Sequence, residues 1–139
     1  MDRKQLVLQN DIEQVPLLAQ FVDEACETAG LNMATSMKLN LAIEEAVVNV
    51  MNYAYPQGTV GDISIEAQAD DEQLAFIISD CGSPFDPTAQ QEADITLSAE
   101  ERPIGGLGIH LVRQIMDDVA YERKDNYNIL TLRKKLNNK

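Results

Sequence analysis

Residues 105–121 read GGLGIHLVRQIMDDVAY, a cluster of glycines that runs directly into an amphipathic segment. The apolar spacing predicts a helix from about Gly108 to Met116. Glycines before a helix allow backbone N–H groups to converge on an anion, and the dipole of the helix N-terminus favours negative charge. The stretch therefore indicates a phosphate-binding loop, although a flexible hinge would have the same composition.

The chain before this glycine cluster contains an unusually long stretch without periodicity, which begins at Asp80-Cys81-Gly82. Because loops longer than about 15 residues are uncommon in compact domains, we expect residues 83–104 to form a mobile lid. Asp80 ends an apolar strand, where a carboxylate can accept a hydrogen bond from an amino group such as that of adenine. Gly82 would let a ligand approach the backbone closely. Taken alone, an ordinary strand-to-turn Asp-x-Gly is the better explanation.

A polar stripe runs along the helix predicted for residues 35–54. At about 100° per residue, Lys38, Glu45, Asn49 and Asn52 share one arc, and apolar residues flank it on both sides. An amide oxygen one turn from a carboxylate could bind a Mg²⁺ ion that also takes phosphate oxygens. The carboxylate could polarise an attacking hydroxyl. A polar seam against another element explains the helix alone equally well.

The rest of the chain predicts short strands that are mostly joined as hairpins. We expect strands at residues 4–9, 61–69, 73–79, 119–123 and 128–133, and helices at residues 12–29, 35–54 and 108–116. Hairpins imply antiparallel pairing, and the apolar helix faces must cover the sheet. The sequence therefore predicts one α+β domain over residues 1–139, a two-layer sandwich with a mixed, mostly antiparallel sheet and helices on one face.

The composition restricts the partners. The 139 residues carry a net charge of -12, from 23 acidic and 11 basic residues. Such a chain repels nucleic acid and anionic membranes, so we expect neither as a direct partner. No apolar run approaches the roughly 18 residues of a membrane span, and the start has no export signal. Two cysteines make no disulfide framework, which favours a cytoplasmic setting.

The three motifs, in this order, resemble those of the GHKL (Bergerat-fold) ATPase superfamily. Residues 45–49 (EAVVN) look like its N box, residues 80–87 (DCGSPFDP) like its first glycine box, and residues 105–112 (GGLGIHLV) like its second. Within the superfamily, the chain is similar to the anti-sigma serine/threonine kinases of the RsbW, SpoIIAB and RsbT kind. The resemblance extends over residues 4–136. Pro84 replaces the second glycine of the first box, a variant familiar in this subfamily.

The resemblance implies the α/β sandwich of the superfamily, with ATP and Mg²⁺ as cofactors. By this resemblance, Glu45 is the general base, Asn49 is the Mg²⁺ ligand and Asp80 is the residue that recognises adenine. The positions expected to contact the nucleotide are Asn49, Asn52, Asp80, Gly82, Gly105, Gly106, Leu107, Gly108 and Ile109.

The resemblance further implies an ATP-dependent kinase that phosphorylates a serine or threonine of a STAS-domain anti-anti-sigma protein. It also implies a regulator that holds a sigma factor inactive, and it leaves a homodimer open. The alternative is a nucleotide-gated protein that sequesters such a regulator without phosphoryl transfer. Glu45 favours the enzyme, because a binder has no chemical need for that carboxylate. A structural interaction domain without nucleotide is a third reading, disfavoured by the glycine cluster and long loop.

Overall fold

The computed structural model describes residues 2–56, 58–89 and 106–136 of the chain. Its elements in chain order are β1 (Asp2–Gln9), η1 (Ile12–Gln14), α1 (Val15–Thr28), α2 (Met33–Tyr53), β2 (Asp62–Ala69), β3 (Gln73–Asp80), η2 (Pro87–Ala89), α3 (Gly106–Ile115), β4 (Asp118–Lys124) and β5 (Tyr127–Lys135). This order of strand, helices, hairpin, helix and hairpin confirms the one predicted. Gly105 and residues 90–104 of the expected lid lie outside the described residues.

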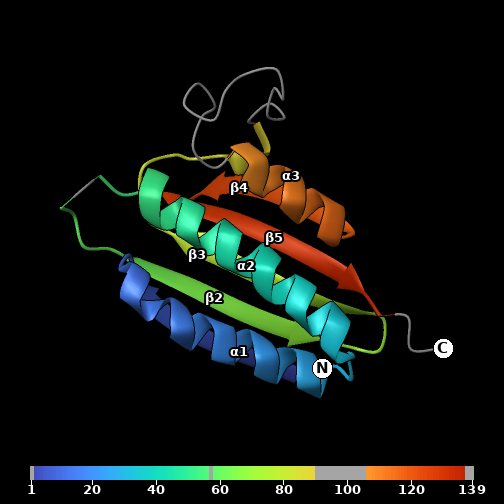
Figure 1. The fold of residues 1–139 in the computed structure, drawn as a ribbon. Helices are drawn as coiled ribbons and strands as arrows, with labels where there is room; N and C mark the ends of the chain where they lie inside the picture. The colour runs from blue at the N-terminus through green and yellow to red at the C-terminus, as the bar shows by residue number, and fades with distance from the viewer. Residues whose placement is uncertain (1, 57, 90–105, 137–139) are drawn as a thin grey trace.

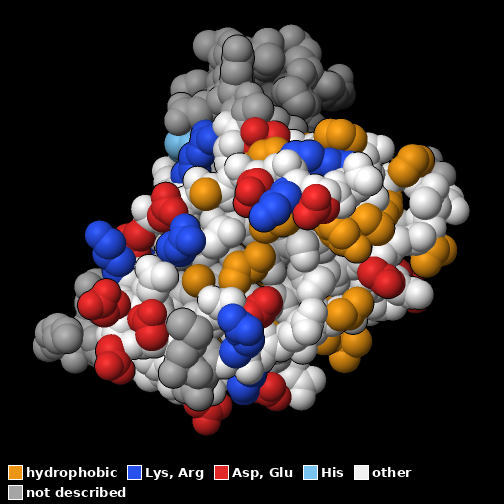
Figure 2. Space-filling model, turned by 180° about the vertical axis from the view of Figure 1, so that it is seen from behind, with side chains coloured by type: hydrophobic (Ala, Val, Ile, Leu, Met, Phe, Trp, Pro, Cys, Tyr) orange, Lys and Arg blue, Asp and Glu red, His pale blue; other side chains and the backbone are white. Residues whose placement is uncertain are grey.

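The strands form one five-stranded sheet in the order β1-β2-β3-β5-β4, and each neighbouring pair is antiparallel. On one face of this sheet, α2 packs between α1 and α3 (Figure 1). On the opposite face the described residues place no helix, and hydrophobic side chains lie among acidic and basic ones (Figure 2). The predicted α+β sandwich with helices on one face is therefore confirmed, whereas the described strands pair only antiparallel and not in the mixed arrangement predicted.

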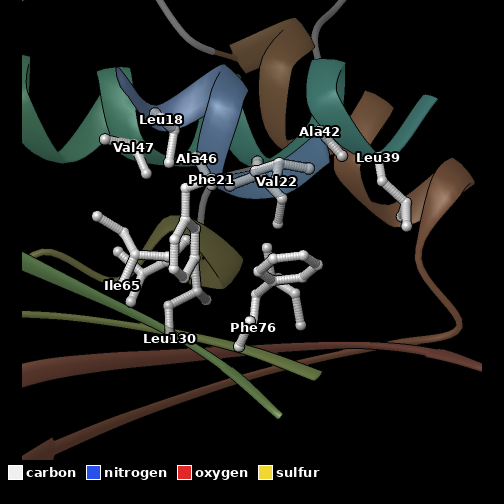
Figure 3. Close-up of a cluster of buried hydrophobic side chains, with 14 of the residues drawn as sticks. Leu18, Phe21, Val22, Leu39, Ala42, Ala46, Val47, Ile65, Phe76 and Leu130 are labelled. Atoms are coloured by element: carbon white, nitrogen blue, oxygen red, sulfur yellow. The ribbon is translucent and has the colours of Figure 1, made fainter. Parts of the chain in front are cut away.

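The core lies between the helices and the sheet and consists mainly of aliphatic, alanine and phenylalanine side chains, with Cys26, Tyr55 and two methionines. On β2 every second residue is buried, beginning with Ile63, so one face of the strand is turned to the helices. Figure 3 shows Leu18, Phe21 and Val22 of α1, Leu39, Ala42, Ala46 and Val47 of α2, and Ile65, Phe76 and Leu130 of the sheet meeting between the layers. Burying one large side chain of this kind contributes about 1.5–3 kcal/mol, so the chain needs no tryptophan to form a core.

The helix predicted for residues 12–29 divides into η1 and α1. Asp11 caps η1, because its side chain accepts a hydrogen bond from the Glu13 N–H at 3.0 Å. Pro16, in the first turn of α1, has no N–H to donate, and this position suits the start of an α-helix. Gly30 follows α1 with a φ of 77°, as expected for the predicted helix stop.

The β4–β5 hairpin has a two-residue turn at Asp125 and Asn126, where the sequence predicts one. Both residues have positive φ, 53° and 69°, and Asp and Asn tolerate this conformation better than other residues with a side chain. The turn sets the register of β4 against β5, with Lys124 opposite Tyr127. β5 also pairs with β3, and this separate pairing places Asn128 opposite Asp80.

No helix among the described residues is long and apolar enough to cross a membrane.

Candidate functional site

Three segments carry the predicted site residues: α2, the turn after β3, and the first turn of α3. β3 is the central strand, and α2 and α3 pack together on the face that the helices cover (Figure 1). The turn after β3 is tied to the end of α2, since the Ser83 N–H donates to the Ala54 carbonyl at 2.7 Å. The fold therefore brings the end of α2 and the Asp80 turn together.

The Tyr55 side chain also links the segments that meet at this junction. Its hydroxyl donates to the Asp62 carbonyl at 2.7 Å and accepts from the Cys81 N–H at 3.2 Å. Burial is the main cause that raises the pKa of Tyr55, so the phenol keeps its proton. One phenol thus connects the end of α2, the start of β2 and the turn after β3.

The polar stripe of α2 extends from the buried side of the helix to its solvent-exposed side. Asn49 is only 5% exposed, Glu45 is half-buried, and Lys38 and Asn52 are exposed. Leu41, on one apolar flank, is exposed as well. None of the other described residues forms a hydrogen bond with the Asn49 side chain, so its amide can bind a ligand. Asn49 is therefore the buried member of the stripe, and Glu45, one turn before it, is half-buried.

Asp80 is the most deeply buried acidic side chain of the site, with 2% exposure. Its Oδ1 accepts hydrogen bonds from the Gly82 N–H and from Asn128 Nδ2, each at 2.9 Å. Burial raises the pKa of Asp80, while these two donors and the charge of Arg123 oppose the rise. Within the described part of the chain, Oδ2 accepts no hydrogen bond. This oxygen is the one with which Asp80 can accept from a ligand.

Asn128 is a site residue that the sequence interpretation missed. It is 4% exposed and binds Asp80 directly. One signal could have indicated it: Asn128 shares the alternation of Leu130 and Leu132, so a polar residue stands in the buried phase of its strand. Its contact with Asp80 depends on the register of two strands far apart in sequence.

The glycine motif forms the start of α3, which begins at Gly106 and not at Gly108 as predicted. The first N–H groups of an α-helix lack intrahelical partners, so those of Gly106, Leu107, Gly108 and Ile109 are the ones that could bind an anion. The Ile109 side chain is buried in the core, so this residue can offer only its backbone. Gly105 lies outside the described residues.

Two contacts attach the segment after Asp80 to the neighbouring helices. Phe85 stacks on Tyr53 of α2 with ring centroids 5.5 Å apart. Arg113 of α3 donates from Nη2 to the Thr88 carbonyl at 2.7 Å. Burial, and secondarily the charge of Glu45, raise the pKa of Tyr53. The start of the expected lid therefore contacts both α2 and α3.

A hollow of about 680 Å³ lies at the end of α2, and Asn52 lines it. Its other lining residues are Met51 of α2 and residues from the end of β1, the start of η1 and the α2–β2 connection, namely Gln9, Asn10, Asp11, Ile12, Tyr55, Pro56, Gly58, Thr59 and Val60. Asn52 is thus the one predicted site residue in this lining. Its contact with nucleotide stays a prediction.

The predicted metal ligand Asn49 can be compared with what Mg²⁺ requires. The described residues contain no group of three or more His, Cys, Asp or Glu side chains that could hold a metal ion. Mg²⁺ generally keeps several waters and binds one or two protein oxygens together with substrate phosphates. A single buried amide on α2, as one protein ligand, is compatible with that pattern.

Comparison with known proteins identifies the family. The profile of the histidine kinase-like ATPase domain matches residues 8–134. The chain belongs to this family. The match spans α2, the Asp80 turn and α3, so every predicted site residue lies within the histidine kinase-like ATPase domain, and the resemblance seen in the sequence is confirmed.

Curated relatives of this histidine kinase-like ATPase domain are named as protein kinases. The chain is 30% identical to the serine/threonine-protein kinase BtrW of Bordetella bronchiseptica over 94 residues, which are 68% of this chain and 66% of the relative. It is 35% identical to the serine-protein kinase RsbW of Listeria monocytogenes over 95 residues, 66% of this chain and 60% of the relative. The match therefore spans somewhat less than two thirds of these relatives.

Two solved structures have the same fold at low sequence identity. The structure of the RsbU and RsbW domains of Rv1364c from Mycobacterium tuberculosis has a TM-score of 0.69 at 14% identity, covering 98% of this chain and 33% of that one. The histidine kinase domain of the Erythrobacter litoralis EL346 blue-light activated histidine kinase has a TM-score of 0.59 at 15% identity, covering 88% and 60%. Both support the architecture of the histidine kinase-like ATPase domain described above.

Proposed function

We propose that the protein is an ATP-dependent serine/threonine-protein kinase that acts as an anti-sigma regulator. The observation that carries this proposal is the position of Glu45 on α2, half-buried and one turn before the buried Asn49 amide. The names of the BtrW and RsbW relatives support the same reaction. We further propose that the acceptor is a STAS-domain anti-anti-sigma protein and that the second partner is a sigma factor.

The adenine of ATP would lie against the Asp80 turn. Oδ1 of Asp80 already accepts from Gly82 and Asn128, so Oδ2 would accept from the exocyclic amine. The phosphates would lie at the N-terminus of α3, where free N–H groups and the helix dipole favour anions. This placement matters because the chain has a net charge of -12 and few cations with which to hold phosphate.

Asn49 would hold Mg²⁺ through its side-chain oxygen. When bound, the ion would neutralise charge on the phosphates during transfer. The chain's own contribution is to present one amide oxygen from the rigid interior of α2, with no competing hydrogen bond from another described residue.

Glu45 would orient the acceptor hydroxyl and accept its proton. The serine oxygen would form a bond to the γ-phosphorus, the bond from that phosphorus to the ADP oxygen would break, and ADP would leave. Glu45 is partly exposed, so a hydroxyl on another protein can reach it. We expect the reaction to take place in the cytoplasm, with neither nucleic acid nor membrane as a direct partner.

The test is incubation with labelled ATP, Mg²⁺ and candidate STAS-domain proteins. Label transferred to a serine or threonine of one of these proteins would support the kinase. Tight ADP and ATP binding without transfer, together with nucleotide-dependent retention of a sigma factor, would replace it by a nucleotide-gated binder. The absence of any nucleotide binding would overturn both.

A further inference from the structure

We propose that Asn128 is a positioning residue that fixes the Asp80 carboxylate as the acceptor for adenine and so determines the choice of base. The proposal rests on the proposed nucleotide site, and it concerns a residue outside the three motifs. Asn128 begins the buried phase of β5, directly opposite Asp80 in the register of the sheet.

All four hydrogen-bonding positions of the Asn128 amide are used. Its Nδ2 donates to Asp80 Oδ1 at 2.9 Å and to the Ser83 carbonyl at 2.8 Å. Its Oδ1 accepts from the Phe85 N–H at 3.1 Å and from the Tyr121 hydroxyl at 2.5 Å. An Asn side chain offers two donors and two acceptor sites, so this amide is saturated.

These partners allow one orientation of the amide. A backbone N–H can only donate, so the Phe85 N–H requires Oδ1 on its side. The Ser83 carbonyl can only accept, so it requires Nδ2 on the other side. Nδ2 must therefore face Asp80, and Oδ1 of Asp80 is committed to accepting. The remaining oxygen, Oδ2, is left to the ligand.

Asn128 also supports the ionised form of the carboxylate, which adenine recognition needs. Burial raises the pKa of Asp80 overall, and the hydrogen bonds from Asn128 and Gly82 oppose this rise. Other titratable groups lie around this carboxylate: Arg123 and Tyr121 of β4, Tyr55 after α2, and Cys81 and Asp86 of the turn. Among these, Arg123 carries the positive charge that supports the carboxylate.

A purely structural role for Asn128 would predict a different effect of its substitution on nucleotide affinity. Its bonds to Ser83 and Phe85 also anchor the turn after β3, so any variant that disrupts the turn could weaken nucleotide binding. Such damage would lower the affinity for every purine nucleotide alike and at every pH. Positioning of Asp80 would instead affect the contact with the exocyclic amine and would depend on protonation.

The experiment measures ADP and inosine diphosphate binding by calorimetry between about pH 6 and pH 9 for the parent and Asn128→Asp. Inosine diphosphate carries a carbonyl where adenine carries its amine. The variant keeps the size of the side chain but places a second carboxylate against Asp80. We expect ADP affinity to fall roughly 10- to 100-fold at neutral pH, because the donor to Asp80 is lost. The ratio of ADP to inosine diphosphate affinity should shrink accordingly.

The pH dependence should distinguish the variant from the parent. The paired carboxylates must take up a proton before one can donate to the other, so ADP affinity of the variant should recover as the pH falls. The parent should gain no affinity over the same range. Asn40→Asp is the matched control, because Asn40 also donates to a carboxylate, Asp23 at 2.6 Å, but between α1 and α2. Its ADP binding should equal that of the parent.

Separate outcomes overturn the two proposals. A parent that binds no ADP would overturn the proposed function and this inference with it. A parent that binds ADP, with an Asn128→Asp variant of equal affinity, equal pH profile and equal base preference, would overturn the inference alone. If Asn128→Asp does not fold, Asn128→Ser replaces it, since a hydroxyl cannot donate to Asp80 and Ser83 at once. An unchanged preference between the two bases in that variant would equally refute the positioning role.

Discussion

The α-carbon of Gly82 lies so close to the end of α2 that a Cβ on this residue would overlap the carbonyl oxygen of Ala54 and lie 2.9 Å from its carbonyl carbon. The obstacle is backbone, which cannot swing aside as a flexible side chain could. The same junction carries the hydrogen bond from Ser83 to Ala54 and the Asp80 carboxylate two residues earlier. A residue without a side chain is therefore required for the Asp80 turn to reach α2.

We predict that Gly82→Ala lowers both stability and nucleotide affinity. The added methyl group must push the turn away from α2, an overpacking effect of about 1–3 kcal/mol, and the Gly82 N–H would move with it away from Asp80. Urea denaturation and ADP titration measure the two effects. Ser83→Ala is the neighbouring control, because the Ser83 side chain is exposed and its backbone hydrogen bond remains. A Gly82→Ala variant as stable as the parent would contradict the close approach.

We predict that Asp80→Asn weakens ADP binding while the fold survives. The two donors on Oδ1 can also bind an amide oxygen, which places the new NH₂ group where Oδ2 stood. A donor would then face the exocyclic amine of adenine. Losing this bond should cost about 1–3 kcal/mol of binding free energy, which calorimetry can resolve. Unchanged ADP affinity would remove Asp80 from the site.

The same Asp80→Asn variant should change how stability depends on pH. Burial raises the pKa of Asp80 in the folded state above 3.8. The stability that Asp80 contributes to the folded protein is therefore fully present below pH 3.8, and it is lost as the pH rises through the folded-state pKa. The substituted amide does not titrate, so relative to the parent the variant should become more stable as the pH rises through that window. Urea denaturation at a series of pH values measures this. If the free energies of unfolding of the two proteins change with pH in parallel, ionisation of the Asp80 carboxylate has no net cost in the folded state.

We predict that Asn49→Ala reduces the effect of Mg²⁺ on nucleotide affinity. The amide is proposed as the protein ligand of the ion, so affinities measured with Mg²⁺ and with EDTA should converge in the variant. Asn40→Ala, in the preceding turns of the same helix, is the matched control and should retain the parental difference. An Mg²⁺ effect of equal size in Asn49→Ala and the parent would exclude Asn49 as the ligand.

Local signals explain what the sequence could predict. Gly30, the alternation of β2 and the Asp125-Asn126 turn each act within a few residues, and each stands where expected. The starts of α2 and α3 moved by two residues, because Asn32 caps α2 through the Thr35 N–H and Gly106 is already helical. These errors affect boundaries and leave the order of elements intact.

The parts that escaped prediction depend on contacts between distant segments. Asn128 meets Asp80 only because β5, and not β4, pairs with β3. Periodicity carries no information on that pairing. Likewise, the arc containing Glu45, Asn49 and Asn52 is visible in the sequence, but the burial of Asn49 and the exposure of Asn52 depend on how α2 packs against the rest of the fold.

The variant Glu45→Gln separates a kinase from a binder. The amide keeps the size of the side chain and its place on α2, so folding and ATP affinity should match those of the parent. It cannot accept the proton of an attacking hydroxyl, and a lost general base slows transfer by roughly 10²–10⁴-fold. The adjacent Glu44→Gln is the matched control, since it makes the same chemical change at a solvent-exposed position of the same helix.

The measurement is the single-turnover rate of label transfer from ATP to the STAS-domain acceptor, with ADP affinity and sigma-factor retention measured in parallel. For a kinase, Glu45→Gln should lose transfer but keep both kinds of binding, while Glu44→Gln should retain all three activities. Transfer at the parental rate in Glu45→Gln would assign the base to another group. For a nucleotide-gated binder, neither substitution would alter any readout and no acceptor would be labelled, because the Glu45 carboxylate would then have no proton to accept.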